Sequence, residues 1–281
     1  MEKTLKKYFG IFALPTLLAF LLYFLIPFIW GIYLSFTRFT IATDAKWIGL
    51  QNYVRAFSNQ DFLHALGFTS MFTVVSVISI NVLAFFLAYL LTRGRKGTNA
   101  FRTIFFMPNL IGGIVLGYIW QIIFNGILSK FGVTLTYSPE YGFWGLVIMM
   151  NWQLIGYMMV IYIAGIQNVP RELIDAAKVD GATAWGTLRH VTLPLVMPSI
   201  TICLFLTLTN SFKLFDQNLS LTGGEPLNQT AMLALDIYNT FYNRGGSWTG
   251  VGQAKAVVFF ILVTIIALVQ LTITRKREVE N

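Results

Sequence analysis

The chain has 281 residues and a net charge of +8; hydrophobic residues make up 56% of it and charged residues only 11%. A soluble domain carries about 25% charged residues because its surface faces water, so this composition excludes an ordinary soluble domain and predicts a membrane protein. The basic residues lie in short segments between long apolar runs, which argues against nucleic-acid binding. The single cysteine, Cys203, excludes an internal disulfide.

Six apolar segments are long enough to cross the hydrocarbon core as helices, which takes about 20 residues. In chain order they are 9–36, 65–91, 104–124, 143–166, 191–212 and 256–273. The first segment follows Lys3, Lys6 and Lys7, but it is much longer than a signal-peptide core and lacks a small-x-small cleavage site. We therefore expect it to be retained as a helix.

The distribution of Lys and Arg predicts the orientation of these helices. With a cytoplasmic N-terminus, the inner segments hold Lys3, Lys6, Lys7, Arg93, Arg95, Lys96, Arg102, Arg171, Lys178, Arg189, Arg275, Lys276 and Arg277. The outer segments then hold only Arg38, Lys46, Arg55, Lys130, Lys213, Arg244 and Lys255. The sequence therefore predicts an all-α polytopic membrane protein of six transmembrane helices, with both termini cytoplasmic.

No acidic residue falls inside a predicted span. Ion-coupled secondary transporters generally place ionisable groups at membrane depth, so this pattern disfavours one, although backbone carbonyls of broken helices can also bind sodium. The chain also has no G-x-x-x-x-G-K-[ST] phosphate loop, no H-E-x-x-H and no G-x-S-x-G. We expect no catalytic residue, no metal site and no cofactor in this chain, which also speaks against a membrane enzyme.

The segment 168–190 reads as two short helices around Gly181, on the cytoplasmic side. Pro170 suits a first helical position, and acidic residues follow near the positive helix end. Gly181 can take a positive φ and end the first helix. One face of that helix is small and compact, with Leu173, Ala176, Ala177 and Asp180 at three- and four-residue spacing. Such a hairpin is suited to dock into a groove on another protein.

This segment resembles the EAA loop of ABC importer permeases. The match covers Asp175-Ala176-Ala177, Asp180-Gly181-Ala182, Trp185 and Val191-Thr192-Leu193-Pro194. Asp175 stands where the family has Glu, and Leu188 where it often has Phe. Further segments resemble the maltose-transporter type of carbohydrate-uptake permease: Leu34-Ser35-Phe36-Thr37, Gly49-Leu50-Gln51-Asn52-Tyr53, Phe212-Lys213-Leu214-Phe215-Asp216 and Leu221-Thr222-Gly223-Gly224.

The resemblance implies a type I ABC importer transmembrane domain in a bacterial cytoplasmic membrane. It implies an N-terminal part at 1–64, a five-helix transmembrane domain at 65–274 with the coupling loop 168–190, and a cytoplasmic tail at 275–281. The coupling surface for an ATPase would be Glu172, Asp175, Ala176, Ala177, Asp180 and Gly181. The implied partners are a second homologous permease, two ABC ATPase subunits that hold ATP and magnesium, an external solute-binding protein, membrane lipid and a sugar.

Polar residues within spans are costly unless they face a cavity, a partner or one another. The wider set of candidates also includes Asn81, Asn109, Gln121, Asn125, Thr207 and Thr209. For the solute pathway we favour Asn151, Trp152, Gln153, Tyr157, Asn210 and Ser211. Hydrogen bonding between helices is the alternative role. An importer for glycerol-phosphate or a polyol also stays open, but we expect no cation at membrane depth, which favours a neutral sugar.

Overall fold

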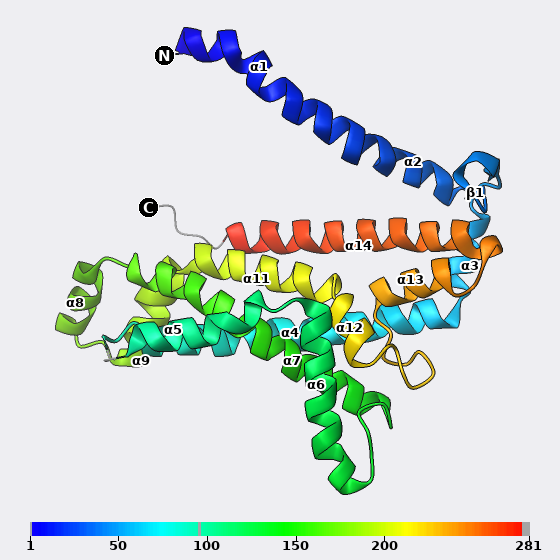
Figure 1. Cartoon of the computed structure of the whole chain (residues 1–281). Helices are drawn as coiled ribbons and strands as arrows, with labels where there is room; N and C mark the ends of the chain where they lie inside the picture. The colour runs from blue at the N-terminus through cyan, green and yellow to red at the C-terminus, as the bar shows by residue number, and fades with distance from the viewer. Residues whose placement is uncertain (1, 95–96, 277–281) are drawn as a thin grey trace. The chain divides into compact units, whose positions relative to one another are not determined.

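The computed structural model describes residues 2–94 and 97–276, which are almost entirely helical (Figure 1). The chain divides into two compact units, Met1–Phe62 with Ile237–Phe260 and Leu63–Asp236 with Ile261–Asn281. Arg95, Lys96, Arg277 and the predicted tail beyond it lie outside the described residues. The boundaries predicted at 64, 274 and 275 stay predictions.

The first unit joins the N-terminal part of the chain to a segment near its end. Its elements are α1 (Glu2–Phe20), the π-helix η1 (Leu21–Leu25), α2 (Ile26–Ser35), β1 (Thr37–Arg38), the 3-10 helix η2 (Ala42–Asp44), β2 (Lys46–Trp47) and α3 (Gln51–Phe57). It also includes most of α13 (Leu233–Tyr242), η6 (Gly246–Trp248) and the first part of α14 (Thr249–Arg275). The two strands pair antiparallel, with Thr37 opposite Trp47.

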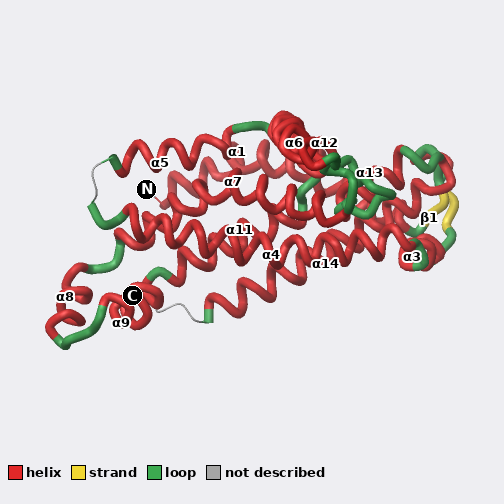
Figure 2. The backbone as a smooth tube through the Cα atoms, turned by 90° about the horizontal axis from the view of Figure 1, so that it is seen from below, coloured by secondary structure: helices red, strands yellow, loops and turns green. Residues whose placement is uncertain are grey.

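The second unit contains the remaining helices, except that the first three residues of α4 belong to the first unit. They are α4 (Gln60–Leu91), α5 (Thr98–Phe106), η3 (Met107–Leu110), α6 (Gly113–Leu128), η4 (Ser129–Phe131), α7 (Pro139–Gln167), α8 (Arg171–Val179), α9 (Ala184–Thr187), the π-helix η5 (Leu188–Thr192), α10 (Leu193–Leu195), α11 (Met197–Phe212) and α12 (Asp216–Leu221). In Figure 2, α4, α5, α7 and α11 run roughly along one direction, whereas α6 is seen end-on.

Within the described residues, five helices are long and apolar enough to cross a membrane, or six if one bent pair counts as a span. The straight candidates are Ala13–Ser35, Gln60–Leu91, Gly113–Phe131, Pro139–Gln167 and Gly246–Arg275. The bent pair is Ala184–Leu195 with Met197–Phe212, at 71°. Each predicted apolar segment therefore overlaps one candidate.

The third predicted span, 104–124, is wrong in its position. The chain breaks there into α5, the short helix η3 and α6, and the candidate span starts only at Gly113. Pro108 is the second residue of η3, and Gly112 is extended, with φ −60° and ψ 141°. Proline lacks the amide proton that a continuous helix needs, so the apolar run changes direction at this point.

Helix α7 forms the centre of the second unit. Leu146, Met149, Met150, Met158 and Met159 on α7 are buried against residues of α4, α6 and α11. At Gly156 the backbone of α5 comes so close that an added Cβ would overlap the carbonyl oxygen of Phe105. The small residue therefore lets α5 and α7 pack backbone to backbone, as is common between membrane helices.

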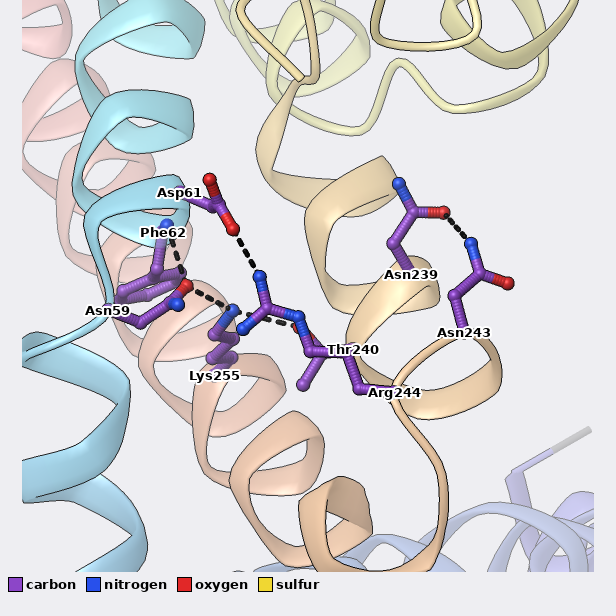
Figure 3. A network of polar contacts seen from close by, with 8 residues as sticks. All are labelled: Asn59, Asp61, Phe62, Asn239, Thr240, Asn243, Arg244 and Lys255. Carbon is purple, nitrogen blue, oxygen red and sulfur yellow. Dashed lines mark hydrogen bonds and ion pairs between the residues drawn. The ribbon is translucent and has the colours of Figure 1, made fainter. Parts of the chain in front are cut away.

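The first unit contains a cluster of polar contacts that joins α13 and α14 to the start of α4 (Figure 3). The Asn59 side-chain oxygen accepts from the Phe62 amide at 3.0 Å and from Lys255 Nζ at 3.1 Å. Lys255 also donates to Thr240 Oγ1 at 2.8 Å, and Arg244 pairs with Asp61. Lys255 was expected in an external loop, but it lies within α14 and is fully buried.

Candidate functional site

A polar cavity of about 550 Å³ lies beside α7, where η3, α11 and α12 meet it. Its lining residues are Asn109, Met150, Gln153, Leu154, Tyr157, Asn210, Lys213, Leu214 and Gln217. The α7 members recur at three- and four-residue spacing, so they occupy one face of that helix. Gln217 Nε2 donates to Gln153 Oε1 at 2.9 Å, which links α12 to α7 at the cavity wall.

Three of the six favoured pathway residues line this cavity: Gln153, Tyr157 and Asn210. The other three do not. Asn151 turns toward α4 and donates to Ser79 Oγ at 2.9 Å. Trp152 is 44% exposed and packs edge-on against Trp120. Ser211 is buried, and its hydroxyl has no hydrogen-bond partner among the described residues.

The residue Gln217 was missed because the predicted fifth span ended before it. The sequence did hold a signal, because Asn210, Leu214 and Gln217 are four and three residues apart, which is the spacing along one face of a helix. In the structure these residues still meet at one cavity, although α11 ends at Phe212 and α12 begins only at Asp216. Lys213, at the C-cap of α11, is the one charged residue among the described residues that line the cavity. Lys213 follows the fifth predicted span, so the expectation of no cation at membrane depth stays a prediction.

Several other polar residues of the spans bond to neighbouring segments. Gln121 donates to the carbonyl oxygen of Leu221 at 3.0 Å, and Asn125 accepts from the Leu135 amide at 2.8 Å. Asn81 contacts both Thr207 and Tyr162. These contacts satisfy polar groups that would otherwise be exposed to hydrocarbon, which is the alternative role considered above.

The segment 168–190 folds as two helices around a tight turn. Helix α8 ends at Val179 with Asp180 as its C-cap, and Gly181 follows with φ +78°, a left-handed conformation that favours glycine. The Gly181 amide donates to the Lys178 carbonyl at 3.0 Å, and the Ala182 amide donates to that of Ala177 at 2.9 Å. Pro170 was expected inside the first helix but is its N-cap residue.

The two faces of α8 differ in their surroundings. Arg171, Ile174, Asp175 and Lys178 face a cavity within the same unit. Residues on the other face are exposed: Glu172, Leu173, Ala176 and Asp180. Of the six expected coupling residues, only Asp175 lines this cavity, and its side chain is still 67% exposed, so the coupling surface stays a prediction.

Asp175 and Lys178 form an ion pair of 2.7 Å on the cavity-facing side of α8. The hydrogen bond from Lys178, together with its charge, holds the pKa of the Asp175 carboxyl below its ordinary value. Both side chains are largely solvent-exposed, so this pair contributes little to stability.

Comparisons with known proteins agree over almost the whole chain. It is 45% identical over 282 residues to the probable starch degradation products transport system permease protein AmyD of Thermoanaerobacterium thermosulfurigenes, covering 97% of this chain and 96% of that protein. It is 31% identical to the multiple sugar-binding transport system permease protein MsmF of Streptococcus mutans, covering 99% of each.

Among solved structures, the chain resembles a subunit of a bacterial ABC transporter involved in the import of the acidic polysaccharide alginate. The TM-score is 0.82, with 22% sequence identity and 98% of each chain covered. This likeness establishes the fold of an ABC importer transmembrane domain. Residues 80–279 match the family model described as a binding-protein-dependent transport system inner membrane component. The chain therefore belongs to this family of multi-pass inner membrane transport proteins.

Proposed function

We propose that the chain is the permease subunit of an ATP-binding-cassette importer for a sugar or oligosaccharide delivered by an external solute-binding protein. The observation that carries the proposal is the cavity beside α7, because amide and phenol side chains dominate its polar wall. Such groups donate to and accept from hydroxyls without requiring a charged solute. The names of relatives, which mention starch degradation products and multiple sugars, support the same solute class.

Lys213 keeps a second solute class open. An ammonium group can donate to a sugar hydroxyl, but it also attracts a phosphate or a carboxylate. Lys213 therefore favours one alternative, an importer for glycerol-phosphate or another anionic solute. An ion-coupled secondary transporter has less support, because no acidic residue lines the cavity among the described residues.

In this proposal the energy comes from two ATPase subunits, which hold ATP and magnesium, and the chain contributes no catalytic residue. The exposed face of α8 would dock into an ATPase subunit, with both termini on the same cytoplasmic side. Leu173 and Val179 support such a contact, because these two apolar side chains of α8 are 46% and 87% exposed. Exposed apolar side chains often mark a surface that binds another protein. A second, homologous permease would complete the pathway, of which this chain forms half.

The test is uptake by the complex in liposomes. The chain is coexpressed with its partner subunits, purified and reconstituted, and the solute-binding protein is added outside. We expect ATP-dependent uptake of radiolabelled maltotriose that requires all subunits, and much weaker uptake of glycerol-3-phosphate. The opposite preference would establish the anionic alternative. Uptake by the chain alone, driven by a sodium or proton gradient, would refute an ATP-driven importer.

A further inference from the structure

A second cavity, of about 600 Å³, lies between the ends of α4 and α7 and the inner side of α8. It is rich in cations: Arg93 comes from the segment after α4, whereas Arg171 and Lys178 come from α8. Asp175 is the one acidic residue among its described lining residues. The buried side chains of Thr187 and Thr192, from α9 and η5, also line it.

The charges in this cavity do not cancel. Asp175 is already paired with Lys178 at 2.7 Å. Within the described part of the chain, neither Arg93 nor Arg171 has a carboxylate oxygen within 4.0 Å. Asp175 also interacts with Arg171, but at a longer distance. Three cations and one carboxylate therefore line the same space, and the net positive charge attracts an anion.

Arg93 is held in place by Tyr89, one turn earlier in the chain. Its Nη2 donates to the Tyr89 hydroxyl at 3.0 Å, and its guanidinium carbon lies 4.6 Å from the centre of the tyrosine ring. A guanidinium has five N–H donors, so this one bond leaves most of them for a ligand. Arg171 is the first residue of α8, where the positive end of the helix dipole adds to its charge.

We propose that this cavity binds the phosphate group of an anionic ligand, which bridges Arg93 at the end of α4 to Arg171 at the start of α8. The planar donor fork of arginine matches phosphate oxygens, and two forks from different elements can share one phosphate. The cavity opens beside the ends of two candidate spans, α4 and α7. Both an anionic lipid headgroup and a soluble phosphate carry the group that this cavity would bind.

Such a bridge would tie the helix that we propose to dock on the ATPase to a membrane span. The inference depends on the proposed function only for the cytoplasmic location and for this consequence. The binding itself follows from the charges and can be measured without transport. Occupancy would favour the arrangement of α8 seen here, because any movement of α8 away from α4 would separate the two arginines from the shared phosphate.

The test measures binding to the full-length chain, purified from membranes with whatever subunits accompany it. Native mass spectrometry would compare phosphatidylglycerol with phosphatidylcholine, and a separate titration would use inorganic phosphate. R93Q and R171Q should each weaken the binding by at least about tenfold, the effect of losing one charge-assisted hydrogen-bonded contact. R93K and R171K should bind more tightly than the glutamine variants but less tightly than the unchanged chain, because lysine keeps the charge and loses the planar fork. Gel filtration would verify that every variant is folded.

R189Q is the matched control, because Arg189 is an exposed cation of η5 that does not line the cavity. Arginine-dependent binding of phosphatidylglycerol alone would identify a lipid headgroup as the ligand, and binding of inorganic phosphate alone would identify a soluble one. Unchanged binding in the R93Q/R171Q double variant, or an equal loss in R189Q, would overturn the proposal. The proposal would also be overturned if a copurifying subunit covered both arginines and neither phosphatidylglycerol nor inorganic phosphate bound. Failed uptake with intact binding would contradict only the proposed function.

Discussion

Tyr162 on α7 donates a hydrogen bond of 2.7 Å to the side-chain oxygen of Asn81 on α4. Asn81 in turn donates to Thr207 Oγ1 on α11 at 3.2 Å, so one chain of polar groups joins three helices. Tyr162 is 1% exposed, and none of the three residues lines the polar cavity beside α7. Their role is therefore to fix the helices that form its wall.

Replacing Tyr162 by Phe should lower the free energy of unfolding by about 0.5–1.5 kcal/mol, because the Asn81 oxygen then loses its partner in an apolar setting. Thermal unfolding of the purified complex in detergent would measure this. Tyr157→Phe is the control, since Tyr157 lines the cavity and has no such partner in the described structure. Equal stability of both variants would contradict a structural role for Tyr162.

Replacing Gly156 by Ala should prevent the close packing of α5 on α7, because the new methyl group would meet the backbone of Phe105 and Phe106. Backbone atoms cannot move aside as a flexible side chain can, so we expect a loss of about 1–3 kcal/mol or more. Yield from membranes and thermal unfolding would measure the loss. Gly67→Ala on α4 is the control, because nothing lies within 4 Å of its added Cβ.

Hydropathy was sufficient to find the membrane helices, since each predicted segment overlaps a candidate span. It misplaced the third because a scan for apolar residues does not register the break at Pro108 and Gly112. It also assigned Lys255 to a loop. A charge is normally a loop signal, but here hydrogen bonds to Asn59 and Thr240 allow it to be buried inside α14.

The pathway residues were harder to predict, because neighbours in sequence point to different sides of a helix. Successive residues are about 100° apart around the axis, so Asn151, Trp152 and Gln153 cover more than half of the circumference. Only Gln153 reaches the cavity, whereas Asn151 faces Ser79 and Trp152 faces Trp120. A single sequence does not indicate which of these faces is solvated.

Replacing Gly181 by Pro should abolish uptake while the chain stays in the membrane. Proline fixes φ near −65°, whereas Gly181 has φ +78°, and it also removes the amide that donates to Lys178. The turn between α8 and α9 would then open. Uptake at matched membrane content would measure the effect. Gly181→Asn should keep much more activity, because Asn tolerates the left-handed conformation; equal loss in both variants would argue against a backbone cause.

Replacing Asp180 by Lys should also abolish uptake, because Asp180 is exposed at the C-terminal end of α8, on the face proposed to dock on the ATPase. The reversed charge would disturb a close contact without altering the fold of the chain. Copurification of the ATPase and its hydrolysis rate would measure the contact. Lys130→Asp, in the distant segment η4, is the charge-reversal control. Normal copurification of the ATPase and normal uptake in Asp180→Lys would contradict the proposed docking face.

Replacing Asn210 by Ala should reduce the affinity for the transported solute about two- to tenfold, the effect of one lost hydrogen bond of about 0.5–1.5 kcal/mol. Asn210 lines the cavity opposite α7 and is not fully buried, so its removal leaves no unpaired partner within the helix bundle. ATP hydrolysis and assembly should therefore persist. Trp152→Ala is the comparison, because Trp152 lies outside this cavity against Trp120. A fall in affinity for Trp152→Ala but not for Asn210→Ala would place the solute on the other side of α7.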